Sequence, residues 1–311
     1  MESGSGGSTG FGVLLSLFRA MRPHQWVKNL FVLAPLLFAS ADQTTGLASV
    51  ADLSSRTLGA LGAALLFCLV SGAVYLLNDV CDLEADRAHP EKRLRPIASG
   101  EVSVAQALSA HAFFVLVGVG GGAWLYGYEF AIVIGGYFLS NTAYSKGLKN
   151  YAYLDVGLIS SGFILRVLAG AYAIQAPVSM WLLLCTFLLA LYLALGKRLH
   201  EVLTIRGEDG ITRKSLKRYS SETLRWWMKF SGVLTCVAFL LYTLDPRTAE
   251  KFGHQFLALT LPNIAYGVRR FFLLAHQTDS FRSPTERMIR DKPFILNLLL
   301  WGVIVIAMLF S

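Results

Sequence analysis

The chain has 311 residues, of which 54% are hydrophobic and 15% are charged, and its formal net charge at pH 7 is +8. A soluble globular domain carries roughly 25% charged residues, so this composition argues against a soluble enzyme and favours an integral membrane protein. No nucleic-acid-binding motif accompanies the positive charge. The charge therefore predicts anionic lipids or phosphorylated substrates as partners, and no nucleic acid.

The N-terminal part of the chain divides into two segments. Residues 1–10 are rich in Gly and Ser, a composition typical of disordered chain. Residues 11–22 place apolar side chains on one helical face beside two arginines, which predicts a helix lying in the membrane interface. We expect a disordered segment over residues 1–10 and a single membrane-embedded domain over residues 11–311.

Apolar blocks of transmembrane length fill the rest of the sequence. They predict an all-α, polytopic bundle of nine transmembrane helices. The first of these spans is the weakest, because Pro35 interrupts it. The predicted spans are residues 26–41, 57–77, 105–125, 128–145, 153–174, 179–196, 228–244, 254–275 and 293–310.

The basic residues predict the orientation of this bundle. In this layout all but four of the 28 lysines and arginines fall on the side of the N-terminus. The exceptions are Arg56, Arg166, Arg247 and Lys251. Because basic loops stay on the cytoplasmic side, we predict a multi-pass protein of the plasma (inner) membrane whose N-terminus and active face are cytoplasmic.

A polar motif follows the second predicted span. If the segment is helical, Asp79, Asp82 and Asp86 recur at i, i+3 and i+7, and Asn78 lies one turn before Asp82. Three carboxylates and an amide oxygen then share nearly one face. Oxygen ligands suit Mg²⁺, which also binds substrate phosphates. The motif therefore predicts a magnesium and diphosphate site.

Basic and polar residues near the predicted cytoplasmic ends of spans are candidate phosphate ligands. Arg93 and Arg95 follow the acidic motif, and Tyr144 and Lys149 flank the end of the fourth span. Guanidinium groups suit bidentate contacts with phosphate. The alternative is a solvated loop that only sets topology, with interfacial side chains that extend towards water; for Lys92 the two interpretations are equally supported.

Charged residues also occur within or at the ends of other spans. Asp155 and Arg166 share a face of the fifth span, with Arg166 about 16 Å deeper. A charge this deep is costly and faces a bundle interior or a wet cavity, so a role at the site and a structural ion pair are both open. Lys28 begins the first span, where it either meets a lipid phosphate or extends to the interface.

A third polar cluster lies where the sixth span ends. Lys197, Arg198 and Glu201 stay together through their i, i+3 and i+4 spacing. The loop that continues to residue 226 has the pattern of an amphipathic lid, in which most basic residues are expected to be solvated.

From Arg22 to the last span, the chain resembles the UbiA superfamily of intramembrane transferases. The segment Asn78–Asp86 matches that superfamily's first Asp-rich motif, which binds Mg²⁺ and a substrate diphosphate, and the nine-helix count agrees. At the position of the second Asp-rich motif this chain has Lys197-Arg198-Leu199-His200-Glu201, so cations replace most of the carboxylates.

In detail the sequence is similar to the phosphoribosyltransferase branch of this superfamily, which joins phosphoribosyl pyrophosphate (PRPP) to decaprenyl phosphate, a step towards arabinan cell-wall precursors. The segments that carry this similarity are Arg22–Asn29, Asn78–Asp86, Arg95–Gly100, Tyr144–Asp155, Arg166–Ala171 and Lys197–Glu201.

The resemblance implies a role for each candidate residue. The implied set is Asn78, Asp79, Asp82 and Asp86 for Mg²⁺ and diphosphate, with the three aspartates as catalytic groups; Arg93, Arg95, Tyr144 and Lys149 for phosphates; Lys28 and Arg166 for the lipid phosphate or its groove; Lys197, Arg198 and Glu201 for the ribose 5-phosphate; and Asp155 as a further substrate-binding residue.

Two other functions are compatible with the residues. One is prenyl transfer from a prenyl diphosphate to an aromatic acceptor, which the missing second Asp-rich motif disfavours. The other is a lipid or solute transporter, whose charged sites would lie near the midplane, whereas here only Arg166 is deep. The oligomeric state is left open, a homo-oligomer included.

Overall fold

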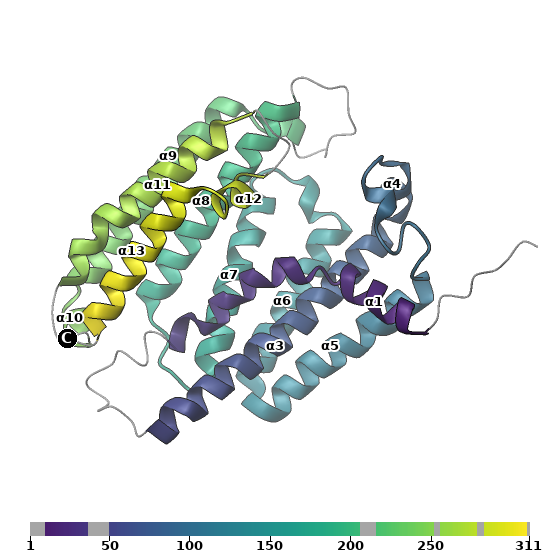
Figure 1. Ribbon diagram of the computed structural model, residues 1–311, viewed down its shortest axis with the longest axis horizontal. Coiled ribbons are helices and arrows are strands. Elements are labelled where there is room, and N and C mark those ends of the chain that lie inside the picture. Colours follow the sequence, from purple (N-terminus) through teal and green to yellow (C-terminus); the bar gives the residue numbers. More distant parts are fainter. Residues whose placement is uncertain (1–9, 37–49, 206–215, 252–255, 279–282, 310–311) are drawn as a thin grey trace, which may run out of the picture. The chain divides into compact units, whose positions relative to one another are not determined.

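A computed structural model of the protein describes residues 10–36, 50–205, 216–251, 256–278 and 283–309. All regular elements in these ranges are helices, as Figure 1 shows. The prediction of an all-α protein is therefore confirmed. The predicted disordered segment lies outside the described residues, except for Gly10, which is the first residue of a helix.

Most of the described residues lie in helices. In chain order they are α1 (Gly10–Ala20), the 3₁₀ helix η1 (Pro23–Leu33), α3 (Val50–Cys81), α4 (Leu83–Ala88), η3 (Lys92–Leu94), α5 (Val104–Tyr126), α6 (Tyr128–Lys146), η4 (Leu148–Asn150), α7 (Leu154–Ala173), α8 (Met180–Ile205), η5 (Leu216–Arg218), α9 (Ser221–Leu244), α10 (Pro246–Lys251), η6 (Phe256–Thr260), α11 (Leu261–His276), α12 (Pro284–Met288) and α13 (Lys292–Leu309).

Five helices in the described part of the chain are long and apolar enough to cross a membrane. They are α3, α5, α7, α8 and α9, and α13 is a shorter apolar helix. This result supports an integral membrane protein, while the count of nine spans stays a prediction.

The first predicted span differs from a regular transmembrane helix. Its described part is mainly the 3₁₀ helix η1, and residues 37–41 lie outside the described ranges. Pro23 at the start of η1 and Pro35 just after it both lack an amide hydrogen, so neither can donate a helical backbone bond.

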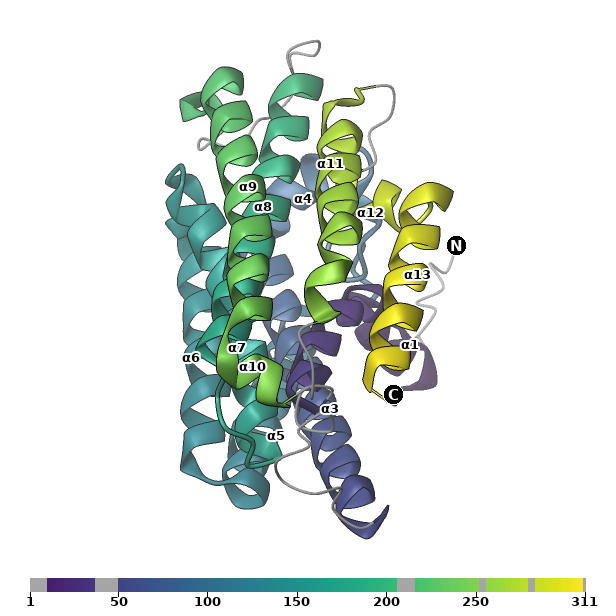
Figure 2. The same ribbon diagram turned by 90° about the vertical axis from the view of Figure 1, so that its left-hand side faces the viewer.

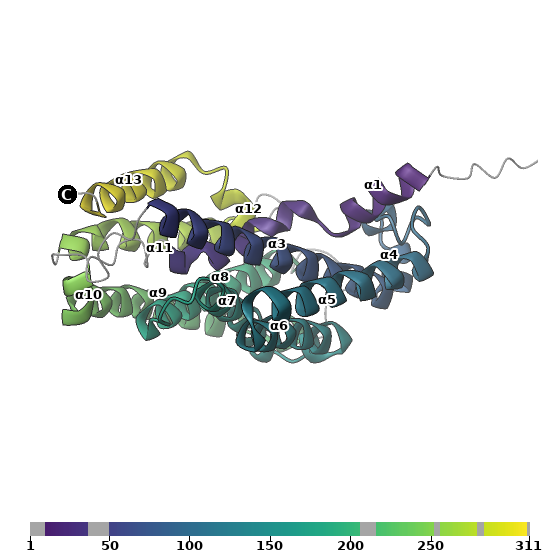
Figure 3. The same cartoon turned by 90° about the horizontal axis from the view of Figure 1, so that it is seen from below.

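Contacts within the chain define two compact units, and α7 contributes its first half to one and its second half to the other. The first unit comprises described residues up to Leu36, with Ser55–Gly147 and Leu165–Ala176. Its core includes Phe67, Phe130 and Tyr137. Figure 3 shows α5 beside α6, and Gly118 and Gly122 of α5 allow side chains of α3 and α6 to approach closely.

The second unit contains Leu148–Ile164 and the described residues from Pro177 onward, together with residues 50–54. Helices α8, α9 and α11 lie side by side in it, as Figure 2 shows. Tyr192, Met228 and Phe271 meet in its core. A side chain at Gly196 would collide with Phe271, at 2.5 Å from the new Cβ, so this glycine sets the distance between α8 and α11.

The loop of residues 89–102 in the first unit is fixed at several points. Ile97 and Val102 are buried against α1, α3 and α5, each 1% exposed. Glu101 accepts a hydrogen bond from Ser16 Oγ on α1 at 2.7 Å and forms an ion pair with Arg19. Ser103 and Gln106 then start α5 with a reciprocal capping box. The loop therefore has a defined path.

Helix α1 agrees with the prediction of an amphipathic N-terminal helix. Its apolar side chains Phe11, Leu14, Leu15 and Phe18 are all exposed, while Ser16 and Ala20 face the rest of the first unit. An exposed apolar face of this kind fits a helix that lies in a membrane interface.

Candidate active site

The acidic motif lies where α3 meets α4, and the two helices are separated by Asp82 alone. The backbone of Asp82 (φ −97°, ψ 9°) interrupts the regular helix that the i, i+3, i+7 spacing assumed. Nevertheless, the Asp82 amide donates to the Asn78 carbonyl at 2.9 Å, and the Asp86 amide donates to the Asp82 carbonyl at 2.8 Å. The segment thus keeps a nearly helical course.

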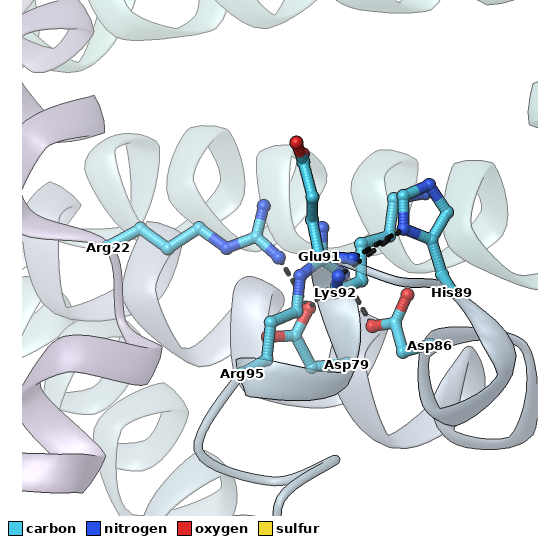
Figure 4. A network of polar contacts seen from close by, with 7 residues as sticks. All are labelled: Arg22, Asp79, Asp86, His89, Glu91, Lys92 and Arg95. Atoms are coloured by element: carbon cyan, nitrogen blue, oxygen red, sulfur yellow. Dashed lines mark hydrogen bonds and ion pairs between the residues drawn. The ribbon is translucent and has the colours of Figure 1, made fainter.

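Asp79 and Asp86 meet at a shared arginine, as Figure 4 shows. Arg95 Nη1 lies 3.2 Å from Asp79 Oδ1 and 2.5 Å from Asp86 Oδ2. Arg22 Nη2 donates to the same Asp79 oxygen at 2.5 Å. The structure therefore brings together Asp79, Asp86 and Arg95, and adds Arg22.

The carboxylates of these ion pairs are nearly buried, so they depend on their arginine partners for neutralisation. The Asp79 and Asp86 side chains are 2% and 4% exposed, whereas Arg22 and Arg95 are 24% and 27% exposed. Buried carboxylates are stable only when they are paired. The four formal charges cancel, and the arginines form the more accessible side of this arginine–aspartate cluster.

Arg22 was not predicted to be a site residue. It connects α1 to η1 and adopts a left-handed backbone conformation, φ 55° and ψ 64°, which is uncommon for a residue other than glycine. Its guanidinium lies 5.0 Å from the centre of the Tyr75 ring and pairs with Asp79. Its position in the Arg22–Asn29 segment was the only indication of a role in the sequence. Its left-handed backbone conformation could not be predicted from the residue types.

The chemistry of the cluster fits a divalent cation. A single nitrogen of Arg95 lies within hydrogen-bonding distance of one oxygen from each carboxylate, so a cation there would meet two hard oxygen ligands. Across the described residues, no three His, Cys, Asp or Glu side chains group as metal ligands. Asn78 and Asp82 are half-buried on the same segment, and their coordination stays a prediction.

The other predicted phosphate ligands are distributed around the chain. Arg93 is exposed on η3, one residue from the exposed Lys92. Tyr144 is half-buried near the end of α6 in the first unit, and Lys149 is half-buried on η4 in the second. Their contacts with phosphate remain predictions.

Arg166 is buried within the first unit, 6% exposed, as its depth in a span predicted. Its Nε donates to Asn29 Oδ1 at 2.8 Å, and its Nη2 donates to the Tyr137 hydroxyl at 2.9 Å. The guanidinium also lies over the rings of Phe67 and Tyr137. Arg166 thereby ties η1 to α6 and α7, with half-buried Lys28 next to Asn29.

Asp155 belongs to a different network, in the second unit. Arg198 Nε donates to Asp155 Oδ2 at 2.7 Å, and Arg198 also forms an ion pair with Glu201. The Tyr219 hydroxyl donates to Asp155 Oδ1 at 2.5 Å and accepts from the Tyr153 amide at 2.7 Å. Asp155 and Arg166 thus lie on one helix but in separate polar networks.

This second network shows how the predicted polar cluster at the end of α8 is paired. Arg198 is 2% exposed and already holds two carboxylates, while the neighbouring Lys197 is exposed. Burial raises the pKa of the Tyr219 phenol, and its bond to Asp155 adds to the shift, so the hydroxyl stays protonated. Tyr219 was not predicted because it lies in the charge-rich segment after residue 197. Residues 206–215 of that segment are outside the described ranges.

The chain is similar to proteins named decaprenyl-phosphate phosphoribosyltransferase. It is 34% identical to that of Mycolicibacterium smegmatis, over 95% of this chain and 93% of the relative. It is 33% identical to that of Mycobacterium tuberculosis, over 93% and 92%, and 31% identical to that of Corynebacterium glutamicum, over 92% and 84%.

Solved structures agree with the fold. A UbiA homologue from Archaeoglobus fulgidus bound to DMAPP and Mg²⁺ superposes with a TM-score of 0.67 at 18% identity, over 95% of this chain and 99% of that one. A digeranylgeranylglyceryl phosphate synthase gives 0.67 at 17% identity, over 96% and 98%. At this identity the likeness concerns the fold alone.

The sequence pattern of the UbiA prenyltransferase family matches residues 32–288, which include α3 to α11 and the arginine–aspartate cluster apart from Arg22. The resemblance inferred from the acidic motif is thereby confirmed, and the chain belongs to the UbiA prenyltransferase family of transferases.

Proposed function

We propose that the protein transfers the 5-phosphoribosyl group of PRPP to decaprenyl phosphate or a related polyprenyl phosphate, with release of diphosphate. The observation that carries this proposal is the pair of buried carboxylates, Asp79 and Asp86, held by arginine on their accessible side. It is joined by similarity to decaprenyl-phosphate phosphoribosyltransferases over more than nine-tenths of this chain.

The reaction exchanges one C1–oxygen bond of ribose for another. The bond to diphosphate breaks and its electron pair leaves with the diphosphate, while a lipid phosphate oxygen forms the new bond at C1. As in glycoside cleavage, the transition state has oxocarbenium character. A lipid phosphate is ionised near neutral pH, so the site needs no strong general base.

Asp79 and Asp86, with Asp82 and Asn78 beside them, would hold Mg²⁺. When bound, this ion neutralises negative charge on the departing diphosphate. Arg95, Arg22 and Arg93 supply further positive charge, and the fixed path of the 89–102 loop keeps the backbone of Arg95 beside the acidic motif. Tyr144 and Lys149 are further proposed phosphate ligands.

The remaining predicted residues take supporting roles in the proposal. Lys197 is exposed and suited to contact the ribose 5-phosphate, whereas Arg198 orients Asp155 and Glu201 through its ion pairs. Arg166 and Lys28 line the groove or meet the lipid phosphate. The excess of basic residues in the predicted loops supports a site on the cytoplasmic face of the plasma membrane.

The test is turnover by purified protein in detergent with PRPP and decaprenyl phosphate, read by mass spectrometry of the lipid fraction. We expect a lipid product heavier by one phosphoribosyl unit and lost when EDTA removes the metal. A folded protein that makes no such product, but consumes a prenyl diphosphate with an aromatic acceptor, would replace the proposal with prenyl transfer. Intact movement of substrate across vesicles would replace it with transport.

A further inference from the structure

The arginine–aspartate cluster poses a problem for metal binding, if the proposed function and its Mg²⁺ site are accepted. Arg95 Nη1 already occupies the point between Asp79 and Asp86 at which one cation can meet both carboxylates. A guanidinium nitrogen and a metal ion cannot occupy that point at the same time, because each would be held there by Asp79 Oδ1 and Asp86 Oδ2. A metal ion that bridges the two carboxylates at this point therefore requires Arg95 to leave.

Charge strengthens this conclusion. Arg22 and Arg95 together balance Asp79 and Asp86. A divalent ion that entered alone would add positive charge to this balanced set of carboxylates and guanidinium groups, beside nearly buried side chains, which is costly where water is scarce. A metal ion that arrives with a diphosphate brings its own negative charge and offers the displaced guanidinium a new partner.

The position of Arg95 allows this movement. It caps the short η3 helix and precedes Pro96, in extended backbone with φ −65° and ψ 144°. The backbone is anchored, because the Ser99 amide donates to the Arg95 carbonyl at 2.8 Å and Ile97 is buried. The side chain is 27% exposed, against 2–4% for the carboxylates, so it can turn outward while the loop stays in place.

We propose that the Arg95 guanidinium is the cation that neutralises Asp79 and Asp86 before substrate binds. When a metal–diphosphate complex binds, Arg95 leaves the two carboxylates to the metal and pairs with the diphosphate. Arg95 thus excludes free metal and attracts the complex, which makes metal and diphosphate binding mutually dependent. Arg22 keeps its bond to Asp79 and provides a fixed positive charge. Arg95 is in this scheme a specificity-determining residue as well as a phosphate ligand.

The decisive experiment uses the full chain in detergent and two probes without ribose or lipid. The first is Mn²⁺ alone, followed by electron paramagnetic resonance of the free ion. The second is preformed Mg²⁺–diphosphate, followed by calorimetry. Replacing Arg95 by glutamine should tighten Mn²⁺ binding roughly tenfold and weaken binding of the complex by a similar factor, within the usual range of coupling between sites.

The opposite signs of these two changes separate exchange from a structural role, because a damaged site would lose affinity for both probes. Lys92→Gln is the matched control, since it removes the same charge from an exposed side chain three residues away. It should change neither affinity more than about twofold, as expected for a screened surface charge. Thermal unfolding establishes that each variant is folded.

The proposal is overturned if Arg95→Gln binds free Mn²⁺ no more tightly than the wild type. If that variant does not fold, Arg95→Lys serves instead: it keeps the charge but has one nitrogen, so free Mn²⁺ should stay excluded while the complex binds more weakly. Unchanged affinity of the lysine variant for the complex would contradict the exchange. Because neither probe contains a sugar, a failure of phosphoribosyl transfer leaves this test intact.

Discussion

Arg198 and Asp155 form an ion pair in which the two side chains are 2% and 0% exposed, with Nε and Oδ2 2.7 Å apart. Replacing Arg198 by methionine leaves a buried carboxylate with the Tyr219 hydroxyl but without its counter-ion. Loss of one partner of a buried pair costs about 3–5 kcal/mol, so we expect a large fall in the thermal unfolding midpoint. Lys197→Met, on the exposed neighbour, should have little effect; equal shifts would contradict the structural role of Arg198.

Asp86→Asn and Asp82→Asn should abolish phosphoribosyl transfer while the protein stays folded. Each change removes a negative charge from the proposed metal and diphosphate site but keeps the size of the side chain. Turnover and thermal unfolding are measured together. Glu84→Gln, an exposed carboxylate on the same short helix, is the control and should keep turnover within about twofold, as for a screened surface charge. Full activity of both aspartate variants at ordinary Mg²⁺ would remove these residues from the site.

Gly170→Ala should be strongly destabilising. A Cβ at this position would lie 1.9 Å from the carbonyl oxygen of Val32, which is backbone and cannot rotate away. Overpacking of this kind costs typically about 1–3 kcal/mol or more, and expression and the unfolding midpoint should both fall. Gly157→Ala, on the same helix with no neighbouring atom within 4 Å of the new Cβ, is the matched control. A smaller loss at Gly170 than at Gly157 would be inconsistent with this close approach.

The stability contribution of Asp291 should depend on pH. Hydrogen bonds from Arg270 hold the pKa of this carboxyl below its ordinary 3.8, helped by the Phe294 amide at the start of α13. A lowered pKa stabilises the fold above the ordinary value, and this contribution is lost as pH falls through the folded-state value. Asp291→Ala should therefore cost about 1–2 kcal/mol at pH 7, as a lost helix cap does.

The pH series supplies its own control for Asp291. The difference in unfolding free energy between the wild type and Asp291→Ala should shrink as pH falls below about 4, where carboxylates begin to protonate. A difference that stays constant down to pH 3 would show that the side chain acts through packing and not through its charge.

Hydrophobic patterning was sufficient to predict the helical fold, because apolar blocks of membrane length have few other structures available. It predicted α5 as residues 105–125, against the observed Val104–Tyr126. It failed near Pro23 and Pro35, where η1 is a 3₁₀ helix, because hydropathy alone does not register which backbone amides are missing. It also missed that α3 begins at Val50, because Asp52 and Arg56 make the first two turns of this helix too polar to be counted as part of an apolar span.

The aspartates and Arg95 of the candidate site were predictable from the sequence, but Arg22 and the pairing of the arginines with the carboxylates were not. Asp79 and Asp86 follow from spacing along one segment. Arg22 pairs with Asp79 across 57 positions of sequence, and Tyr219 reaches Asp155 across 64. Such pairings depend on tertiary packing, for which a single sequence carries no periodic signal. For the same reason the hydrogen-bond partners of Arg166 could not be predicted, although its depth in a span indicated that its charge would require such partners.

Glu101 links two parts of the molecule that differ in their surroundings. It binds Ser16 and Arg19 of α1, whose opposite face exposes Phe11, Leu14, Leu15 and Phe18, and it ends the loop that carries Arg95. Whatever covers those apolar side chains therefore also supports the loop that carries Arg95. Lipid composition and detergent choice then become variables of the enzyme's chemistry, and rates from different solubilised preparations should be compared only after reconstitution into a common bilayer.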